Sequence, residues 1–140
     1  MITVKRWGPT FLRIVLGLIF IAHGWDKVTG LWGWIAQGQE WGFVNYVVFM
    51  PLFPPVFWAV CATLAEFLGG ILVFIGYRAR MASFFLATVM IVALLGIHVP
   101  KGLGPEAGLI SEIEFPLALL AMAVSLMLSG PGRYSVKLRR

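Results

Sequence analysis

The chain has 140 residues, of which 60% are hydrophobic and only 12% are charged. Soluble domains average about 25% charged residues, so this chain has too few charges to solvate the surface of a soluble domain. Long apolar runs occupy 11–22, 56–75, 81–97 and 115–128. These properties exclude a soluble enzyme, a nucleic-acid-binding module and a secreted disulfide-rich domain. They predict a multi-pass membrane protein that forms one domain over 1–140.

Four segments of the sequence are long enough and apolar enough to cross a bilayer, which takes about 20 helical residues. Pro55 begins the second segment, Pro100 follows the third, and Gly130 follows the fourth. Two of the three connections are short, so neighbouring helices should run antiparallel. The sequence therefore predicts an all-α fold, an antiparallel four-helix transmembrane bundle with spans at about 7–25, 55–76, 80–98 and 113–129.

The long connection between the first two spans, 26–54, is rich in tryptophan, with Trp32, Trp34 and Trp41. Tryptophan concentrates at the level of the lipid headgroups. This connection is therefore predicted to be a short interfacial helix or a re-entrant segment that lies on the bundle.

Positive charges indicate the orientation of the bundle, because cytoplasmic loops carry an excess of lysine and arginine. Lys27 and Lys101 fall on one side of a four-span chain. A larger set falls on the other side: Lys5, Arg6, Arg78, Arg80, Arg133, Lys137, Arg139 and Arg140. We therefore expect both termini to be cytoplasmic.

Ionisable side chains within the first two spans indicate which faces point into the bundle, because each costs about 2.5–3.5 kcal/mol in lipid. One face of the first span combines two cations with small or aromatic residues at heptad spacing: Arg13, Gly17, Phe20, Gly24 and Lys27. In the second span Glu66 lies among small residues that permit close helix packing: Ala59, Ala62, Thr63, Gly69 and Gly70. Both faces are predicted to be interior.

The ends of the last two spans add further polar residues. The third span ends at His98, and Glu114 heads a stripe of small residues in the fourth: Ala118, Ala121, Ser125 and Ser129. By depth, His23 and Lys27 lie in the same outer half of the membrane as these two residues, with Glu66 beneath them. Four helices are therefore predicted to converge on one outward-opening polar pocket.

These residues resemble the DoxX family of small four-helix membrane proteins. Residues 13–27 (RIVLGLIFIAHGWDK) are similar to the family's first-helix pattern, and 65–76 (AEFLGGILVFIG) to its Glu-x-x-Gly-Gly signature. Ile97-His98, Glu114-Phe115-Pro116-Leu117 and the Gly130-Pro131-Gly132 ending also fit. The resemblance covers nearly the whole chain except 31–54.

The resemblance implies a bacterial or archaeal inner (plasma) membrane protein with ties to redox chemistry. Relatives include a quinone-reducing subunit of a thiosulfate-oxidising complex, and others are linked to assemblies for thiol and oxidant defence. The expected partners are the lipid bilayer, membrane or peripheral redox subunits and a second copy of the chain, with no nucleic acid. A dithiol mechanism is excluded, because Cys61 is the single cysteine.

The leading functional hypothesis is quinone-linked oxidation of a small substrate, with sulfur-containing molecules such as thiosulfate among the candidates. A quinone needs an apolar slot, donors for its carbonyl oxygens and a proton path. His98 or His23 could donate to a carbonyl, Lys27 could stabilise a reduced anion, and Glu66 or Glu114 could relay protons. Phe20, Trp25 and Phe115 could form the walls of the slot.

Three alternatives remain open. A metal could be held by His23, His98, Glu66 and Glu114, but no helix carries the paired-ligand spacing of carboxylate bundles, so no metal site is predicted. The charges could instead form structural pairs, with Glu66 bound to Arg13 or Lys27 and His98 to Glu114. Arg13 could also reach the cytoplasmic headgroups by snorkelling. Finally, the chain could be a non-catalytic scaffold subunit of a redox or oxidant-defence complex.

Overall fold

The computed structural model of the chain describes residues 4–105 and 108–136, with side chains from residue 7 onwards. The described elements are all helical. They are α1 (Val4–Gln37), η1 (Gly42–Val47), α2 (Pro55–Ile75), α3 (Ala79–Ala93), η2 (Leu94–His98), α4 (Val99–Gly102) and α5 (Leu109–Ser129). Four continuous helical stretches within them are long and apolar enough to cross a membrane. The predicted all-α membrane bundle is confirmed.

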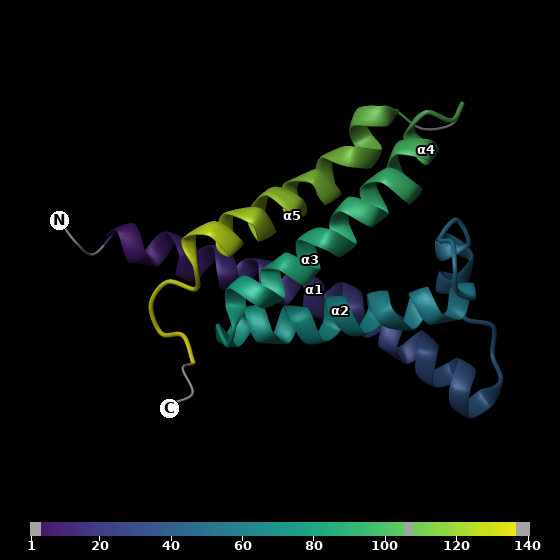
Figure 1. Cartoon of the computed structure of the whole chain (residues 1–140), viewed down its shortest axis with the longest axis horizontal. Coiled ribbons are helices and arrows are strands. Elements are labelled where there is room, and N and C mark those ends of the chain that lie inside the picture. Colours follow the sequence, from purple (N-terminus) through teal and green to yellow (C-terminus); the bar gives the residue numbers. More distant parts are fainter. Residues whose placement is uncertain (1–3, 106–107, 137–140) are drawn as a thin grey trace.

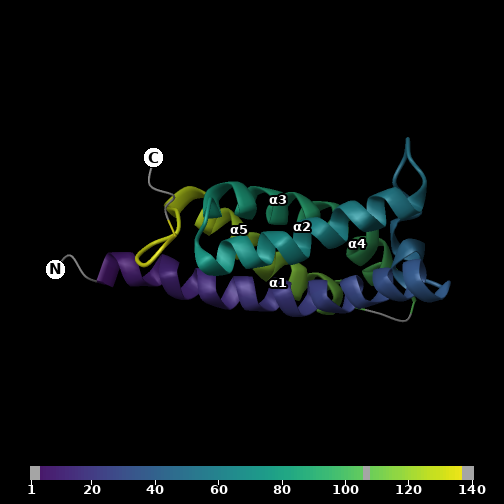
Figure 2. The same cartoon turned by 90° about the horizontal axis from the view of Figure 1, so that it is seen from below.

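The helices pack as two pairs, α1 with α2 and α3 with α5 (Figure 1). The pairs are in contact where α1 begins and α5 ends, and they diverge toward the end that carries η1 and α4 (Figure 1). Figure 2 shows that α1 extends along the whole length of the molecule. The core lies where the pairs meet and is formed by large apolar side chains that include Leu16, Phe20, Val73, Leu86 and Leu126.

Glycines on α1 bring its backbone directly against α2. A Cβ atom at Gly17 would lie 2.7 Å from Cβ of Phe74, and one at Gly24 would lie 2.8 Å from Cα of Phe67. Such distances leave no room for a side chain at either glycine, so the backbones of the two helices are in close contact at these positions. The predicted interior face of α1 is confirmed.

The first helix is longer than the predicted span of 7–25. It continues to Gln37 and ends where Gly38 adopts a left-handed φ of 65°. Gly30 lies within this helix, where it contacts a later segment: a Cβ there would lie 2.7 Å from the ring of Trp41. The connection to α2 therefore shrinks to 38–54, and its short helix is η1, which packs on α2.

The third span also continues past its predicted end. Leu94–His98 form a π-helix, in which the N–H of Val99 donates to the carbonyl of Leu94. This wider turn changes the register of the carbonyls that precede Pro100, so that proline fits in the first turn of α4 instead of ending the helix. The membrane-spanning stretch accordingly runs from Ala79 to Gly102.

The fourth span begins at Leu109, four residues before the predicted 113. Its interior face is formed by Pro116, Leu119, Ala123 and Leu126, whereas Glu114 and the stripe of small residues that follows it are exposed. The prediction that Glu114 heads the packing face was therefore wrong. Leucines occur on several faces of this helix, so more than one face is apolar enough to pack. The face that packs against α3 carries large residues rather than only small ones.

Arg13 is buried at the opposite end of the bundle from the divergence, with 3% of its surface exposed. Its Nη2 donates to the carbonyl of Tyr134 at 3.3 Å, and its Nη1 lies against Gly76, which ends α2. The chain after α5 folds back over this guanidinium, where Thr10 exchanges hydrogen bonds with the backbone of Arg133. Snorkelling of Arg13 to the headgroups is therefore wrong. Lys137, Arg139 and Arg140 lie outside the described residues.

Candidate functional site

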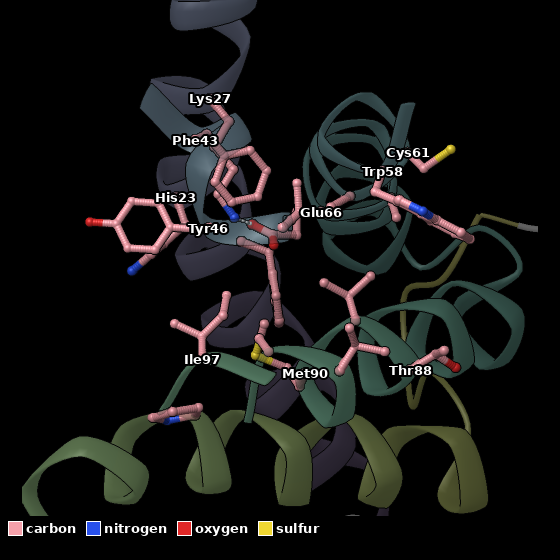
Figure 3. Close-up of a pocket in the computed structure, with 18 of the residues that line it drawn as sticks. His23, Lys27, Phe43, Tyr46, Trp58, Cys61, Glu66, Thr88, Met90 and Ile97 are labelled. Carbon is pink, nitrogen blue, oxygen red and sulfur yellow. Dashed lines mark hydrogen bonds and ion pairs between the residues drawn. The ribbon is translucent and has the colours of Figure 1, made fainter. Parts of the chain in front are cut away.

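A cavity of about 830 Å³ lies between the two diverging helix pairs. Its walls come from α1, η1, α2, α3, η2 and α5, and most of the lining side chains are apolar or aromatic. Ligand pockets for small molecules typically measure about 300–1,000 Å³ and combine apolar walls with a few polar groups. This cleft has both properties (Figure 3).

Lys27 of α1 and Glu66 of α2 form an ion pair in the wall of the cleft. The Glu66 side chain is 4% exposed and that of Lys27 is 22% exposed. The ammonium group also lies 4.3 Å from the ring centre of Phe43, which belongs to η1. Glu66 faces inward because small residues surround it on α2, as its sequence context predicts. The carboxylate thus holds the lysine, while a cation–π contact stabilises the same charge from the opposite side.

His23 closes the cleft on the side between α1 and α5. Its Nδ1 donates to the carbonyl of Ile19 at 3.0 Å, because a carbonyl oxygen can only accept. The ring stacks on Phe115 with centres 5.6 Å apart. With Nδ1 as the donor to this carbonyl, Nε2 is the ring nitrogen that is free to face a ligand.

The opposite side of the cleft, between α2 and α3, is open. The lining residues there are exposed and mostly apolar: Cys61, Leu64, Phe85 and Thr88. All four lie within the membrane-spanning helices α2 and α3. A molecule dissolved in the bilayer can therefore reach the cleft sideways, and its apolar part can remain in contact with lipid.

A second polar cluster joins α4 to α5 at the same end. Lys101 Nζ lies 2.9 Å from Glu112 Oε1, and His98 Nδ1 lies 3.7 Å from Glu112 Oε2. Glu112 is 19% exposed, and His98 lines the cleft at the end of the π-helix. The sequence interpretation paired His98 with Glu114; the structure places Glu112 there instead, one helical turn before the buried Pro116.

Six of the eight residues predicted for the site line the cleft. They are Phe20, His23, Lys27, Glu66, His98 and Phe115. Trp25 and Glu114 are exposed and do not line it; the ring of Trp25 lies 6.1 Å from that of Phe67 on α2. The second alternative for the charges is thus realised in part, because Glu66 pairs with Lys27 and not with Arg13.

The cleft wall also contains three residues that were not predicted from the sequence: Phe43, Tyr46 and Trp58. Phe43 and Tyr46 are three residues apart in η1, a spacing that places both on one face of a 3-10 helix. Trp58 is one turn before Ala62 on the interior side of α2, which is a signal that was available. Within residues 4–105 and 108–136, no three histidine, cysteine or acidic side chains lie close enough to hold a metal ion.

Comparison with known proteins agrees with this architecture. The DoxX family model matches residues 8–99. The chain is 29% identical over 123 residues to the "Putative oxidoreductase CatD" of Bacillus subtilis (strain 168), covering 88% of this chain and 79% of that protein. It is 25% identical over 129 residues to the "Inner membrane protein YqjF" of Escherichia coli (strain K12), covering 92% and 88%. No solved structure matches the chain significantly. Because the family model spans well over half of the sequence, the chain belongs to the DoxX family.

Proposed function

We propose that the cleft binds a membrane quinone and that the protein takes part in the quinone-linked oxidation of a small reduced substrate, such as thiosulfate or a thiol. One observation carries this proposal: an apolar cleft within membrane-spanning helices, open toward lipid between α2 and α3, contains a lysine ion pair and two histidines. The name of the Bacillus subtilis relative is consistent with redox chemistry.

The residues present fit a quinone ring and its isoprenoid tail. Phe20, Phe115 and Trp58 supply flat apolar walls, and the open side between α2 and α3 leaves a path for the tail into the bilayer. Lys27 and Tyr46 carry the hydrogen-bond donors that a carbonyl oxygen requires. Metal chemistry has no comparable donor set within the described part of the chain.

When bound, a quinone accepts two electrons and two protons. Lys27 would hold one carbonyl oxygen by a charge-assisted hydrogen bond, and Glu66 would keep the ammonium in place from behind. His23 and His98 offer ring nitrogens that can carry protons at the cleft wall. The electrons would come from the small substrate or from a redox partner subunit.

We further propose that the protein lies in the inner membrane with both termini in the cytoplasm. The positive-inside distribution of lysine and arginine supports this orientation, and the Escherichia coli relative is named as an inner membrane protein. The cleft would then open in the outer half of the membrane. Reporter fusions at the C-terminus test this directly: an outward-facing C-terminus would overturn the orientation.

Quinone binding can be measured by quenching of tryptophan fluorescence, because Trp58 lines the cleft. We expect a short-chain ubiquinone to quench the purified protein saturably, and Lys27→Met to weaken binding about tenfold, which corresponds to about 1.4 kcal/mol. Glu114→Gln is the matched control, because Glu114 is exposed and lies outside the cleft. If the wild-type protein shows no saturable binding and no quinone co-purifies, the quinone proposal fails and a non-catalytic scaffold role replaces it.

Turnover requires a separate assay. Purified protein in detergent is mixed with thiosulfate or a thiol and a short-chain ubiquinone, and loss of the quinone is followed by absorbance. Turnover that Lys27→Met removes and Glu114→Gln preserves would establish catalysis by the chain itself. Saturable binding without turnover would instead assign the oxidation to a complex with a partner subunit.

A further inference from the structure

We propose that His98 and Glu112 form a carboxylate–imidazole dyad that exchanges a proton with a hydroxyl group bound in the cleft, with Glu112 as the residue that positions His98. This inference rests on the proposed quinone site and assigns the group that handles its proton. The residue that completes the dyad, Glu112, does not itself line the cleft.

The geometry points to a defined tautomer of His98. Its Nδ1 is buried and has no hydrogen-bond partner, and Glu112 Oε2 lies 3.7 Å from it. A carboxylate that faces one ring nitrogen favours the proton on that nitrogen. The opposite nitrogen, Nε2, is then left without a proton and accepts a hydrogen bond from any donor in the cleft.

The environment of Glu112 is asymmetric in a way that suits proton exchange. On one side it faces His98, which lines the cleft, and on the other it binds Lys101, whose side chain is 62% exposed. The hydroxyl group of Tyr46 in η1 interacts electrostatically with the ammonium group of Lys101. Glu114 on the same helix is exposed and belongs to another face. The dyad therefore connects the cleft wall to the surface of the molecule.

The proposed step is a proton transfer in which no electron moves. The O–H bond of a bound hydroxyl breaks and an N–H bond forms at Nε2 of His98, while the Nδ1 proton remains toward Glu112. The carboxylate stabilises the resulting imidazolium, in the manner of other carboxylate–histidine pairs. In the reverse direction the imidazolium returns the proton to the same oxygen.

The π-helix is what brings His98 to this position. Leu94–His98 contain one more residue per turn than an α-helix provides, which rotates His98 relative to α3. Gly102 then lies against the start of α5: a Cβ there would be 2.8 Å from Cα of Leu109 and 3.4 Å from Cβ of Glu112. The approach of the two backbones sets the separation of the dyad.

The first test examines the tautomer and needs no ligand. The chain has two histidines, so His23→Gln leaves one imidazole, and selective ¹⁵N labelling then reports which ring nitrogen of His98 carries the proton. We expect the Nδ1–H form to dominate, and Glu112→Leu to lower the ratio of Nδ1–H to Nε2–H at least about threefold. Glu114→Leu is the matched control and should leave the ratio unchanged. If Glu112→Leu fails to fold, Glu112→Gln replaces it.

The second test examines ligand selectivity with a short-chain ubiquinone and its reduced form. Because Nε2 accepts a hydrogen bond, Glu112→Leu should weaken binding of the reduced form about tenfold and change binding of the oxidised form less than about twofold. An unchanged tautomer ratio, or equal weakening of both forms, would overturn the dyad. If the wild-type protein binds neither form, the proposed function fails, while the ¹⁵N spectra still decide whether Glu112 positions His98.

Discussion

The ion pair between Lys27 and Glu66 gives the sharpest energetic prediction. Breaking a buried pair by removing one partner costs about 3–5 kcal/mol, because the other charge is left without compensation. Glu66 is 4% exposed, so we expect Lys27→Met to lower the free energy of unfolding by about 3 kcal/mol. Lys27 is 22% exposed and also lies over Phe43, so Glu66→Gln should cost only about 2 kcal/mol.

The double variant isolates the interaction itself. Once Lys27 is methionine, Glu66→Gln removes a charge that has already lost its partner, so the second change should cost little. The coupling energy is therefore expected at about 2 kcal/mol. The assay is unfolding in mixed detergent micelles with increasing dodecyl sulfate, followed by far-UV circular dichroism.

An exposed salt bridge in the same protein provides the control. Lys101 pairs with Glu112 at 2.9 Å, but the lysine is 62% exposed, so Lys101→Met should lower the free energy of unfolding far less than Lys27→Met does. If Lys27→Met costs no more than this control, or if the two cleft substitutions are additive within about 0.5 kcal/mol, the pair is solvated. The reasoning that Glu66 is buried away from water would then be refuted.

Three further predictions concern close contacts of two glycines and the hydrogen bonds that hold the C-terminal segment. Gly24→Ala should lower the free energy of unfolding by about 1–3 kcal/mol in the same micelle assay, because its Cβ would lie 2.8 Å from the backbone of α2. Gly8→Ala is the control: its Cβ would enter open space, so the substitution should be neutral or stabilising. Gly96→Ala should lower the free energy of unfolding by about 1–2 kcal/mol, because its Cβ would lie 2.1 Å from the ring of Phe49. In a Phe49→Ala background the same substitution should cost less than about 0.5 kcal/mol. Equal costs in the two backgrounds would show that the two residues are not in contact. Thr10→Val removes two hydrogen bonds to the C-terminal segment, so that segment should be digested several-fold faster in limited proteolysis; an unchanged rate would mean that these bonds do not hold it.

The sequence was informative where polar or small residues interrupt an apolar helix. On α1 the heptad spacing from Arg13 to Lys27 identified the interior face, and on α2 the small residues around Glu66 did the same. These residue types have a reason to avoid lipid, so their positions on the helix define one face. The sequence allowed two partners for Glu66, namely Arg13 and Lys27. Lys27 forms the ion pair, because it lies at the depth of Glu66 in the bundle and Arg13 does not.

Other features could not be read from the sequence for physical reasons. Helix α5 is surrounded by leucines, so the choice of its packing face depends on its partner helices, and Glu112 was overlooked in favour of Glu114. The first helix continues past its predicted end at residue 25, and Gly30 within it contacts Trp41, which comes from a later segment.

The π-helix at Leu94–His98 has a consequence for comparing relatives of this chain. One such turn is equivalent to a single-residue insertion in an α-helix, and every residue beyond it is rotated by about 100° relative to an uninterrupted helix. In an uninterrupted α-helix of the same sequence, Ile97 rather than His98 would point toward α5. An alignment with a relative that lacks this turn therefore needs a one-residue gap here, and a histidine that seems displaced by one position can occupy the same place in space.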